Sequence, residues 1–202
     1  VVLFDIGGGS SEIALVDMSR GRTQRLANHI ASWTSLPVGV VSLAERHGGR
    51  HVSREIFEAM VADVMAMLAA FEGRGALGAL ATGPGFHLLG TSGTVTTLAG
   101  VHLGLERYDR RKVDGLWMDS ADVDRMTETL LSWDFDRRVA NACIGADRAD
   151  LVLAGCAILE AIRRVWPSQR LRVADRGLRE GILIDLMAAD GAWRRRRWRA
   201  GR

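Results

Sequence analysis

Cysteine is scarce in this sequence, which holds only two among 202 residues. Cys143 and Cys156 are too far apart to form a CxxC pair, and Cys156 falls within an apolar helical pattern. Cysteines in such patterns are usually small core residues. The composition therefore argues against a disulfide framework and against a zinc site, and it fits a reducing, cytoplasmic compartment.

Long apolar runs are also missing from the sequence. No stretch approaches the roughly 20 consecutive apolar residues that span a bilayer, and the first residues show no signal-peptide pattern. We therefore expect no membrane partner. An initiator methionine is missing too: the chain opens at Val1, inside a predicted strand, and on this ground we expect a fragment of a longer protein.

Positive charge is nearly balanced by negative charge over most of the chain. The net charge is +3, but the ten residues from Trp193 to Arg202 contain six arginines and no acid, so the other 192 residues carry a net −3. This distribution predicts a disordered basic tail over residues 191–202, and it argues against a nucleic-acid-binding face on the fold. Nucleic-acid binding by the tail itself remains an alternative, which deletion of residues 193–202 would test.

The most informative stretch is Asp-Ile-Gly-Gly-Gly-Ser-Ser-Glu, residues 5–12. An apolar run precedes it and an apolar pattern follows it, which predicts a strand, a tight glycine turn and a second strand. Three glycines remove every Cβ from the turn, so its backbone can approach a ligand closely and adopt φ > 0. Successive N–H groups in such a turn can form an anion site.

Carboxylates flank the same turn and extend its chemistry. Acids beside phosphate donors suit a phosphate that arrives with Mg²⁺, because this ion prefers carboxylate and phosphate oxygens. We therefore take Asp5 and Glu12 as candidate metal ligands. The candidate phosphate-binding residues are Gly7, Gly8, Gly9, Ser10 and Ser11.

Other interpretations of this stretch are weaker. A glycine-rich surface hairpin would explain the turn, but a carboxylate at the end of an apolar strand needs a partner, which favours a binding site. No lysine follows the glycines, which excludes a Walker loop. Glu12 stands where a dinucleotide-binding fingerprint needs its third glycine.

A second small-residue turn follows a short apolar strand predicted over residues 86–89. A helix is predicted over residues 95–103, so the free N–H groups and the dipole of its first turn would converge on the turn. We take this turn as a candidate anion- or nucleotide-binding loop, with an ordinary strand-to-helix connection as the alternative. The residues of the loop are Gly90, Thr91, Ser92, Gly93 and Thr94.

The remaining pattern indicates an α/β fold that opens with an antiparallel meander. Strands are predicted over residues 23–33 and 171–174, with an extended piece over 36–41. Ser53 is a predicted N-cap, and the helix after it runs to residue 71. Further helices are predicted over 119–131, 137–143, 147–166 and 182–187. Residues 108–114 read as a solvated connector, and residues 175–181 as either a part of a site or a salt-bridged corner.

Residues 5–12 resemble the second phosphate loop of the actin/Hsp70/sugar-kinase superfamily, in the form found in the Ppx/GppA family of exopolyphosphatases and guanosine pentaphosphate phosphohydrolases. Residues 90–99, 109–115, 148–150 and 175–181 are similar to further motifs of that family. The resemblance covers residues 1–190. It implies a ribonuclease H-like, actin-type ATPase domain with a mixed sheet and flanking helices, corresponding to the second, C-terminal actin-like domain of the family.

The resemblance also implies a function. A full-length parent would hydrolyse terminal phosphoanhydride bonds of inorganic polyphosphate or guanosine pentaphosphate with Mg²⁺ as cofactor. The glutamate thought to activate water in the family lies upstream of these motifs, so we expect no catalytic residue in this chain and no activity from the chain alone. Two alternatives stay open: a nucleotide-binding actin-like module without hydrolysis, and a structural domain that forms a homodimer.

Overall fold

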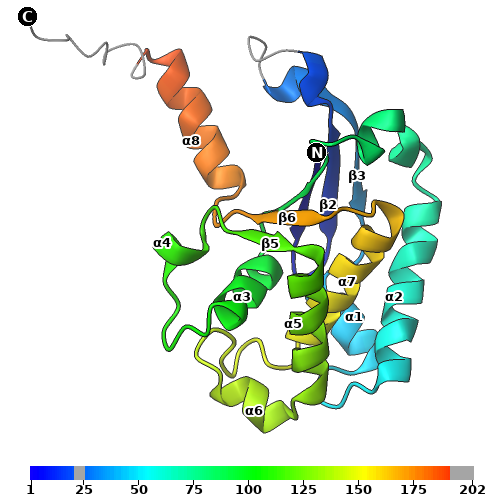
Figure 1. The fold of residues 1–202 in the computed structure, drawn as a ribbon, viewed down its shortest axis with the longest axis vertical. Coiled ribbons are helices and arrows are strands. Elements are labelled where there is room, and N and C mark those ends of the chain that lie inside the picture. Colours follow the sequence, from blue (N-terminus) through cyan, green and yellow to red (C-terminus); the bar gives the residue numbers. More distant parts are fainter. Residues whose placement is uncertain (21–25, 192–202) are drawn as a thin grey trace, which may run out of the picture.

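A single mixed sheet forms the centre of the molecule. The computed structural model describes residues 1–20 and 26–191, and within them six strands lie in the order β3-β2-β1-β4-β6-β5 (Figure 1). β1 pairs antiparallel with β2 and β2 with β3, whereas β4 is parallel to both β1 and β6. The predicted α/β class and the initial antiparallel meander are confirmed. The strands are β1 (Val2–Ile6), β2 (Ser11–Val16), β3 (Ile30–Leu36), β4 (Leu88–Gly90), β5 (Trp117–Asp119) and β6 (Arg170–Val173).

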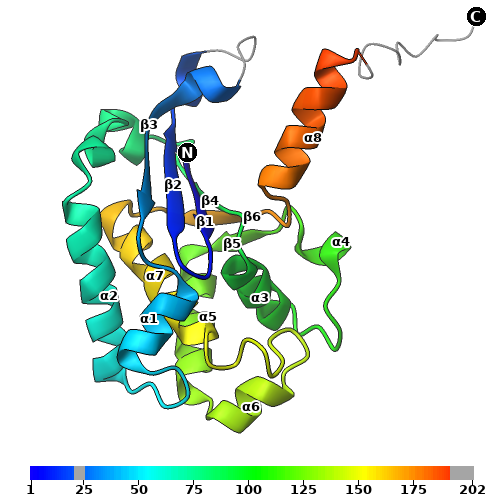
Figure 2. The same ribbon diagram turned by 180° about the vertical axis from the view of Figure 1, so that it is seen from behind.

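Helices gather on one side of this sheet (Figures 1 and 2). α2 packs along α7, and α3 contacts both α5 and α7. In β1 the alternate residues Val2, Phe4 and Ile6 are buried against these helices, so Asp5 belongs to the opposite face. These packed helices are α1 (Val40–His47), α2 (Arg54–Ala69), α3 (Gly93–His102), α5 (Ser120–Ser132) and α7 (Val152–Val165).

Local sequence explains how the helices begin and how closely they pack. The Ser53 hydroxyl accepts a hydrogen bond from the Ile56 N–H at 3.3 Å, which confirms the predicted N-cap of α2. The residues of α7 that face α3 are small and apolar. A Cβ on Gly155 would lie 2.3 Å from Thr94 Oγ1, so only glycine allows this approach of the two helices.

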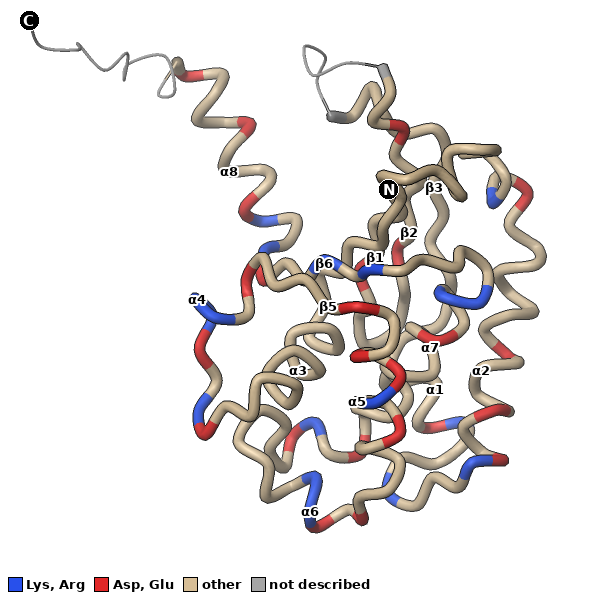
Figure 3. Tube along the Cα trace, in the orientation of Figure 1, with Lys and Arg blue, Asp and Glu red and all other residues tan. Residues whose placement is uncertain are grey.

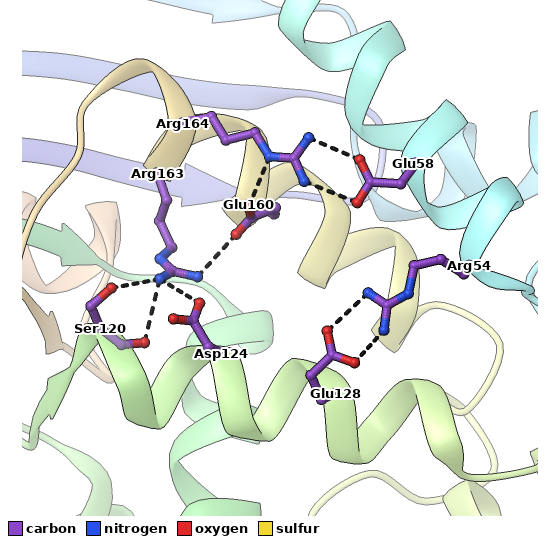
Figure 4. Close-up of polar contacts among 8 residues, drawn as sticks. All are labelled: Arg54, Glu58, Ser120, Asp124, Glu128, Glu160, Arg163 and Arg164. Atoms are coloured by element: carbon purple, nitrogen blue, oxygen red, sulfur yellow. Dashed lines mark hydrogen bonds and ion pairs between the residues drawn. The ribbon is translucent and has the colours of Figure 1, made fainter.

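Ion pairs join α2, α5 and α7 on their outer surface (Figure 4). The Arg164 guanidinium binds both carboxylate oxygens of Glu58 at 2.8 and 2.9 Å, and it also donates to Glu160 at 2.8 Å. Arg54 pairs with Glu128 across α2 and α5. The network therefore links three helices that are distant in sequence.

The predicted extended piece over residues 36–41 is wrong at its end, because Val40 begins helix α1. Valine favours strands, but the Gly39 N–H donates to the Ser42 hydroxyl at 2.9 Å and the first N–H groups of α1 find acceptors in a neighbouring loop. The strand predicted over 23–33 is in part a 3₁₀ turn, Leu26–His29, which precedes β3. Residues 23–25 of that prediction lie outside the described residues.

Other element boundaries differ from the predictions in smaller ways. The 108–114 connector contains one helical turn, α4 (Arg110–Val113), and the predicted 137–143 helix is α6 (Phe135–Ala140). The predicted helix start at residue 147 is five residues early, because residues 147–151 form turns. β5 was not predicted; it has only three residues and runs directly into α5.

The last helix, α8 (Leu178–Ala189), projects from the body of the molecule (Figures 1 and 2). It buries none of its residues, although six of them are large and apolar. The predicted disordered tail lies outside the described residues from position 192 onward. None of the helices within the described part of the chain is long and apolar enough to cross a membrane.

Candidate functional site: a glycine loop beside two carboxylates

The glycine turn between β1 and β2 rests on the first turn of α1. The Gly7 N–H donates to the Ser10 carbonyl at 2.8 Å and closes the turn. The Gly7 carbonyl accepts from the Val40 N–H at 2.9 Å, and the Gly8 carbonyl accepts from the Val41 N–H at 2.8 Å. The loop carbonyls thus satisfy N–H groups that a helix start leaves open.

These contacts set the direction of the loop N–H groups. In a trans peptide the C=O and the following N–H point in opposite directions, and the described chain has no cis peptide. Because the carbonyls of Gly7 and Gly8 point at α1, the N–H groups of Gly8 and Gly9 point away from it. Within the described residues neither N–H has an acceptor, and the Ser10 N–H has none either. Such a group of free N–H donors can form an anion site.

The three glycines of the turn leave room around the backbone, and they are not needed for unusual dihedral angles. None of Gly7, Gly8 and Gly9 has a positive φ, which corrects the expectation that this turn uses φ > 0. A Cβ on Gly9 would meet no atom within 4 Å, so the loop is open at the position where a ligand would approach. The tight position is Gly39, where a Cβ would lie 2.4 Å from the carbonyl oxygens of Gly7 and Gly8.

The two predicted metal ligands lie side by side. Asp5 and Glu12 are directly opposite each other in the antiparallel pair β1–β2, so their side chains share one face of the sheet. Burial, and after it the charge of Glu12, raises the pKa of the Asp5 carboxyl, while a hydrogen bond from the Thr91 side chain acts in the opposite direction. The pair is therefore an accumulation of negative charge that a cation would relieve.

The two serines of the loop play different parts. The Ser10 hydroxyl donates to Glu12 Oε1 at 2.8 Å. Ser11 is fully buried, and its hydroxyl donates to the Val38 carbonyl at 2.7 Å. Ser11 therefore fixes the segment before α1, and we do not retain it among the candidate phosphate donors.

The donor chemistry of this site fits Mg²⁺. Two carboxylates supply the hard oxygen ligands that Mg²⁺ prefers, and the nearby free N–H groups leave room for a further anion such as phosphate. Across residues 1–20 and 26–191, no group of three or more His, Cys, Asp or Glu side chains could hold a metal ion by itself. Two protein carboxylates with water and phosphate oxygens completing the shell are a common Mg²⁺ arrangement.

The second predicted loop forms the N-terminus of α3. Ser92 is the N-cap, but its hydroxyl makes no capping hydrogen bond and is buried without a partner among the described residues. The Arg148 guanidinium lies beside the next residue: a Cβ on Gly93 would be 3.5 Å from Arg148 Nη1. The helix dipole, the free hydroxyl and the guanidinium all favour a negative ligand here.

The five residues predicted for this loop divide into two groups. Thr91, Ser92 and Gly93 line a cavity of about 440 Å³. Gly90 and Thr94 have packing roles instead: a Cβ on Gly90 would lie 2.7 Å from the Phe4 ring, and Thr94 meets Gly155. The cavity is completed by Thr96, Tyr108, Cys143, Ile144, Arg148 and Asp175.

This cavity continues toward the carboxylate pair. A neighbouring cavity of about 380 Å³ contains Asp5 and shares Thr91 and Asp175 with the first. The Tyr108 hydroxyl donates to Asp175 Oδ2 at 2.6 Å on this shared wall. Burial, and then Asp175, raises the pKa of Tyr108 to about 12, so the phenol is a neutral donor at physiological pH.

The turn before α8 is both a salt-bridged corner and a part of the cavity wall. Arg176 donates to Asp114 at 2.9 Å, and Arg110 lies 3.4 Å from Asp175 Oδ2 and 3.5 Å from Glu180. Figure 3 shows charges of both signs near α4 and the base of α8. Arg110 is therefore paired with two acids, and its charge is largely neutralised.

The sequence did not predict an individual role for three residues of this site. Tyr108 and Arg148 line the cavity beside α3, and Ser35 contacts Glu12. Tyr108 is the only tyrosine in the chain, and it stands in a run of charges; that isolation was a usable signal. Ser35 donates to Glu12 Oε1 at 2.8 Å from β3. This partner depends on strand register, which the sequence did not define.

Comparison with known proteins supports the same fold. The model of the Ppx/GppA phosphatase family matches residues 1–190. No curated protein matches the chain. A crystal structure of the Aquifex aeolicus Ppx/GppA family member superposes with a TM-score of 0.75 at 24% identity, covering 94% of this chain and 56% of that one. An exopolyphosphatase from Cytophaga hutchinsonii gives 0.74 at 23%, covering 93% and 57%.

A further solved structure, described as an exopolyphosphatase-like protein, gives a TM-score of 0.76 at 24% identity, covering 93% of this chain and 59% of that one. The chain thus spans a little more than half the length of each of these proteins. Likeness at this identity shows the fold, and the family match over nearly the whole chain shows the kinship. The chain belongs to the Ppx/GppA phosphatase family, with an actin-like domain over the matched residues.

Proposed function

We propose that this domain supplies one half of the active cleft of a phosphoanhydride hydrolase, which removes the terminal phosphate of inorganic polyphosphate or of guanosine pentaphosphate. The observation that carries the proposal is the glycine loop. Contacts with α1 turn the N–H groups of Gly8 and Gly9 in a common direction, and the Asp5–Glu12 pair lies at the adjoining strand ends. Membership of a phosphatase family is consistent with it.

In the proposed reaction, water forms a bond to the terminal phosphorus and the bridging P–O bond breaks, with the bridging oxygen keeping the electron pair. Phosphoryl transfer of this kind depends mainly on positioning and charge stabilisation. The N–H groups of Gly8, Gly9 and Ser10 would donate to the oxygens of the terminal phosphate. Asp5 and Glu12 would hold Mg²⁺, which when bound offsets charge on the leaving phosphate oxygens.

The remaining cleft wall suits the rest of an extended polyanion. The α3 N-terminus, the Ser92 hydroxyl and Arg148 would bind phosphates further along the substrate. We assign the group that activates water to a segment outside this chain, corresponding to the part of the solved relatives that the chain does not cover. Asp5 and Glu12 would therefore hold the metal ion and would not take the proton from the attacking water.

The test is phosphate release by the full-length protein, offered both substrates with Mg²⁺. Asp5→Asn should lower turnover by at least about 100-fold, since substitution even of groups that merely support a metal ligand lowers activity 10–100-fold. Glu45→Gln, on the exposed surface of α1, is the matched control and should leave turnover unchanged. An Asp5→Asn variant with the rate of the unaltered protein would remove Asp5 from the metal site.

A second assay addresses the role of the missing half. The 202-residue chain by itself should hydrolyse neither substrate, because half of the cleft and the water-activating group would be absent. Appreciable hydrolysis by this chain alone would refute the two-part cleft. Tight ATP binding without polyphosphate binding would instead support a nucleotide-binding module, for which the 440 Å³ cavity beside α3 offers room.

A further inference from the structure

Glu12 has two hydroxyl donors on one oxygen. Ser10 Oγ and Ser35 Oγ each donate to Glu12 Oε1 at 2.8 Å. The donors come from different places: Ser10 belongs to the glycine loop, and Ser35 to strand β3. Glu12 Oε2 has no donor among the described residues, so the carboxylate is held through one oxygen and open through the other.

Strand register brings this arrangement about. Asp5 is directly opposite Glu12, and Glu12 is directly opposite Ser35, so the three form one row across β1, β2 and β3. Directly opposite residues have Cβ atoms about 4.5–5.5 Å apart. Ser35 thus reaches Glu12 without any contact with the glycine loop.

A serine hydroxyl has a single proton to donate. While Ser10 gives its proton to Glu12, it cannot donate to a phosphate held by the neighbouring N–H groups. If Ser10 turns to a phosphate, Glu12 would lose a donor, and a carboxylate without donors competes strongly for one. A second donor on the same oxygen removes that competition.

We propose that Ser35 is a positioning residue of the cleft: it keeps Glu12 oriented and releases the Ser10 hydroxyl for the terminal phosphate of the substrate. This inference rests on the proposed function, since it assumes that a phosphate binds at the loop. Ser35 itself touches neither the phosphate nor the metal in this scheme. It acts through Glu12 and Ser10.

The test uses the full-length protein and measures phosphate release from polyphosphate. Ser35→Ala should raise KM for polyphosphate and the Mg²⁺ concentration at half-maximal rate by about tenfold each, the effect of one hydrogen bond to a charged group. Ser35→Thr keeps the hydroxyl and should restore both values. Thr34→Ala, on the same strand but on the other face, is the control and should change neither.

A double-mutant cycle isolates the coupling between the two serines. Because the effect of Ser35 on polyphosphate binding passes through the Ser10 hydroxyl, Ser35→Ala should raise KM for polyphosphate much less in a Ser10→Ala protein than in the unaltered one. Equal effects in both backgrounds, an unchanged Ser35→Ala protein, or a Ser35→Thr protein that fails to recover would each overturn the inference. An unaltered protein that releases no phosphate would overturn the proposed function instead.

Discussion

At the scale of single residues, the environment of the Asp5 carboxyl disfavours its ionised form. Burial and the neighbouring Glu12 raise its pKa above the ordinary value. The folded protein therefore binds this proton more tightly than the unfolded chain does. The stability that Asp5 contributes is present below its ordinary pKa and is lost as the pH rises through the raised folded value.

This sign leads to a prediction for the metal-free protein. At pH 7 the ionised Asp5 destabilises the fold, so Asp5→Asn should unfold at the same temperature as the unaltered protein or a higher one, and the advantage should shrink as the pH falls toward 4. Thermal unfolding in EDTA from pH 4 to 8 measures this. A variant that is less stable at pH 7 would show that the ionised carboxyl makes contacts that favour folding.

Two glycines offer a matched pair of substitutions. Gly39→Ala would place a Cβ 2.4 Å from backbone oxygens of the loop, which cannot move aside. We expect a loss of about 1–3 kcal/mol in unfolding free energy, as for other overpacked sites. Gly9→Ala meets no atom within 4 Å and should keep its stability within about 1 kcal/mol while losing phosphate release.

Denaturant unfolding of the chain and phosphate release by the full-length protein separate these two outcomes. A stable Gly39→Ala protein would mean that the loop can leave α1 at little cost. A Gly9→Ala protein with full activity would show that no ligand approaches the backbone there.

At the scale of elements, the sequence predicted the kinds of structure better than their ends. The antiparallel meander and the helix after Ser53 follow from alternation and capping, which are local signals. The helix at Val40 was missed because its N-terminal acceptors are the carbonyls of Gly7 and Gly8, more than 30 residues away. A β-branched pair such as Val40–Val41 then favours a strand on local grounds.

The candidate site divides in the same way. Asp5, Glu12 and the glycines could be identified because they are adjacent in sequence. The roles of Ser35 and Arg148 depend on register and on the packing of distant elements, which one sequence does not reveal.

The joint between α2 and α7 allows a comparison of charge with packing. Glu58 and Arg164 have side chains 43% and 41% exposed, and exposed pairs typically contribute about 0–1 kcal/mol. Glu58→Ala should therefore lower the unfolding free energy by less than about 1 kcal/mol, and the difference should fall at high salt. Leu68→Ala, at a fully buried position of α2, should lower it by about 2–5 kcal/mol.

Urea unfolding at low and high salt measures both changes. Should Glu58→Ala prove as damaging as Leu68→Ala, the ion pairs of Figure 4 would have to act as one cooperative network.

At the scale of the whole molecule, α8 stands apart from the other long helices. Its apolar residues occur on all sides, and a helix of that kind is usually buried. Leu178 is 77% exposed, and Leu183 and Leu186 are each 58% exposed. The structure thus leaves all six large apolar side chains of one helix exposed, and a contiguous exposed apolar surface usually marks an interaction site.

We expect the isolated 202-residue chain to self-associate through this helix. Sedimentation velocity at rising protein concentration should show dimers or larger species, and Leu183→Lys together with Leu186→Lys should return the chain to a monomer. Val41→Lys, an exposed apolar position on α1, is the control and should leave association unchanged. A chain that stays monomeric at every concentration would contradict this.

The hydrogen bonds between the glycine loop and the first turn of α1 have one more consequence. Reversing a peptide plane at Gly7 or Gly8 would deprive the Val40 or Val41 N–H of its acceptor, so the loop cannot change state unless the helix frays. Deuterium uptake at these two valine amides would therefore act as a gauge of the loop. A ligand bound to the N–H groups of Gly8 and Gly9 would hold the loop in place and would therefore slow deuterium uptake at these valine amides, although it contacts the other side of the loop backbone.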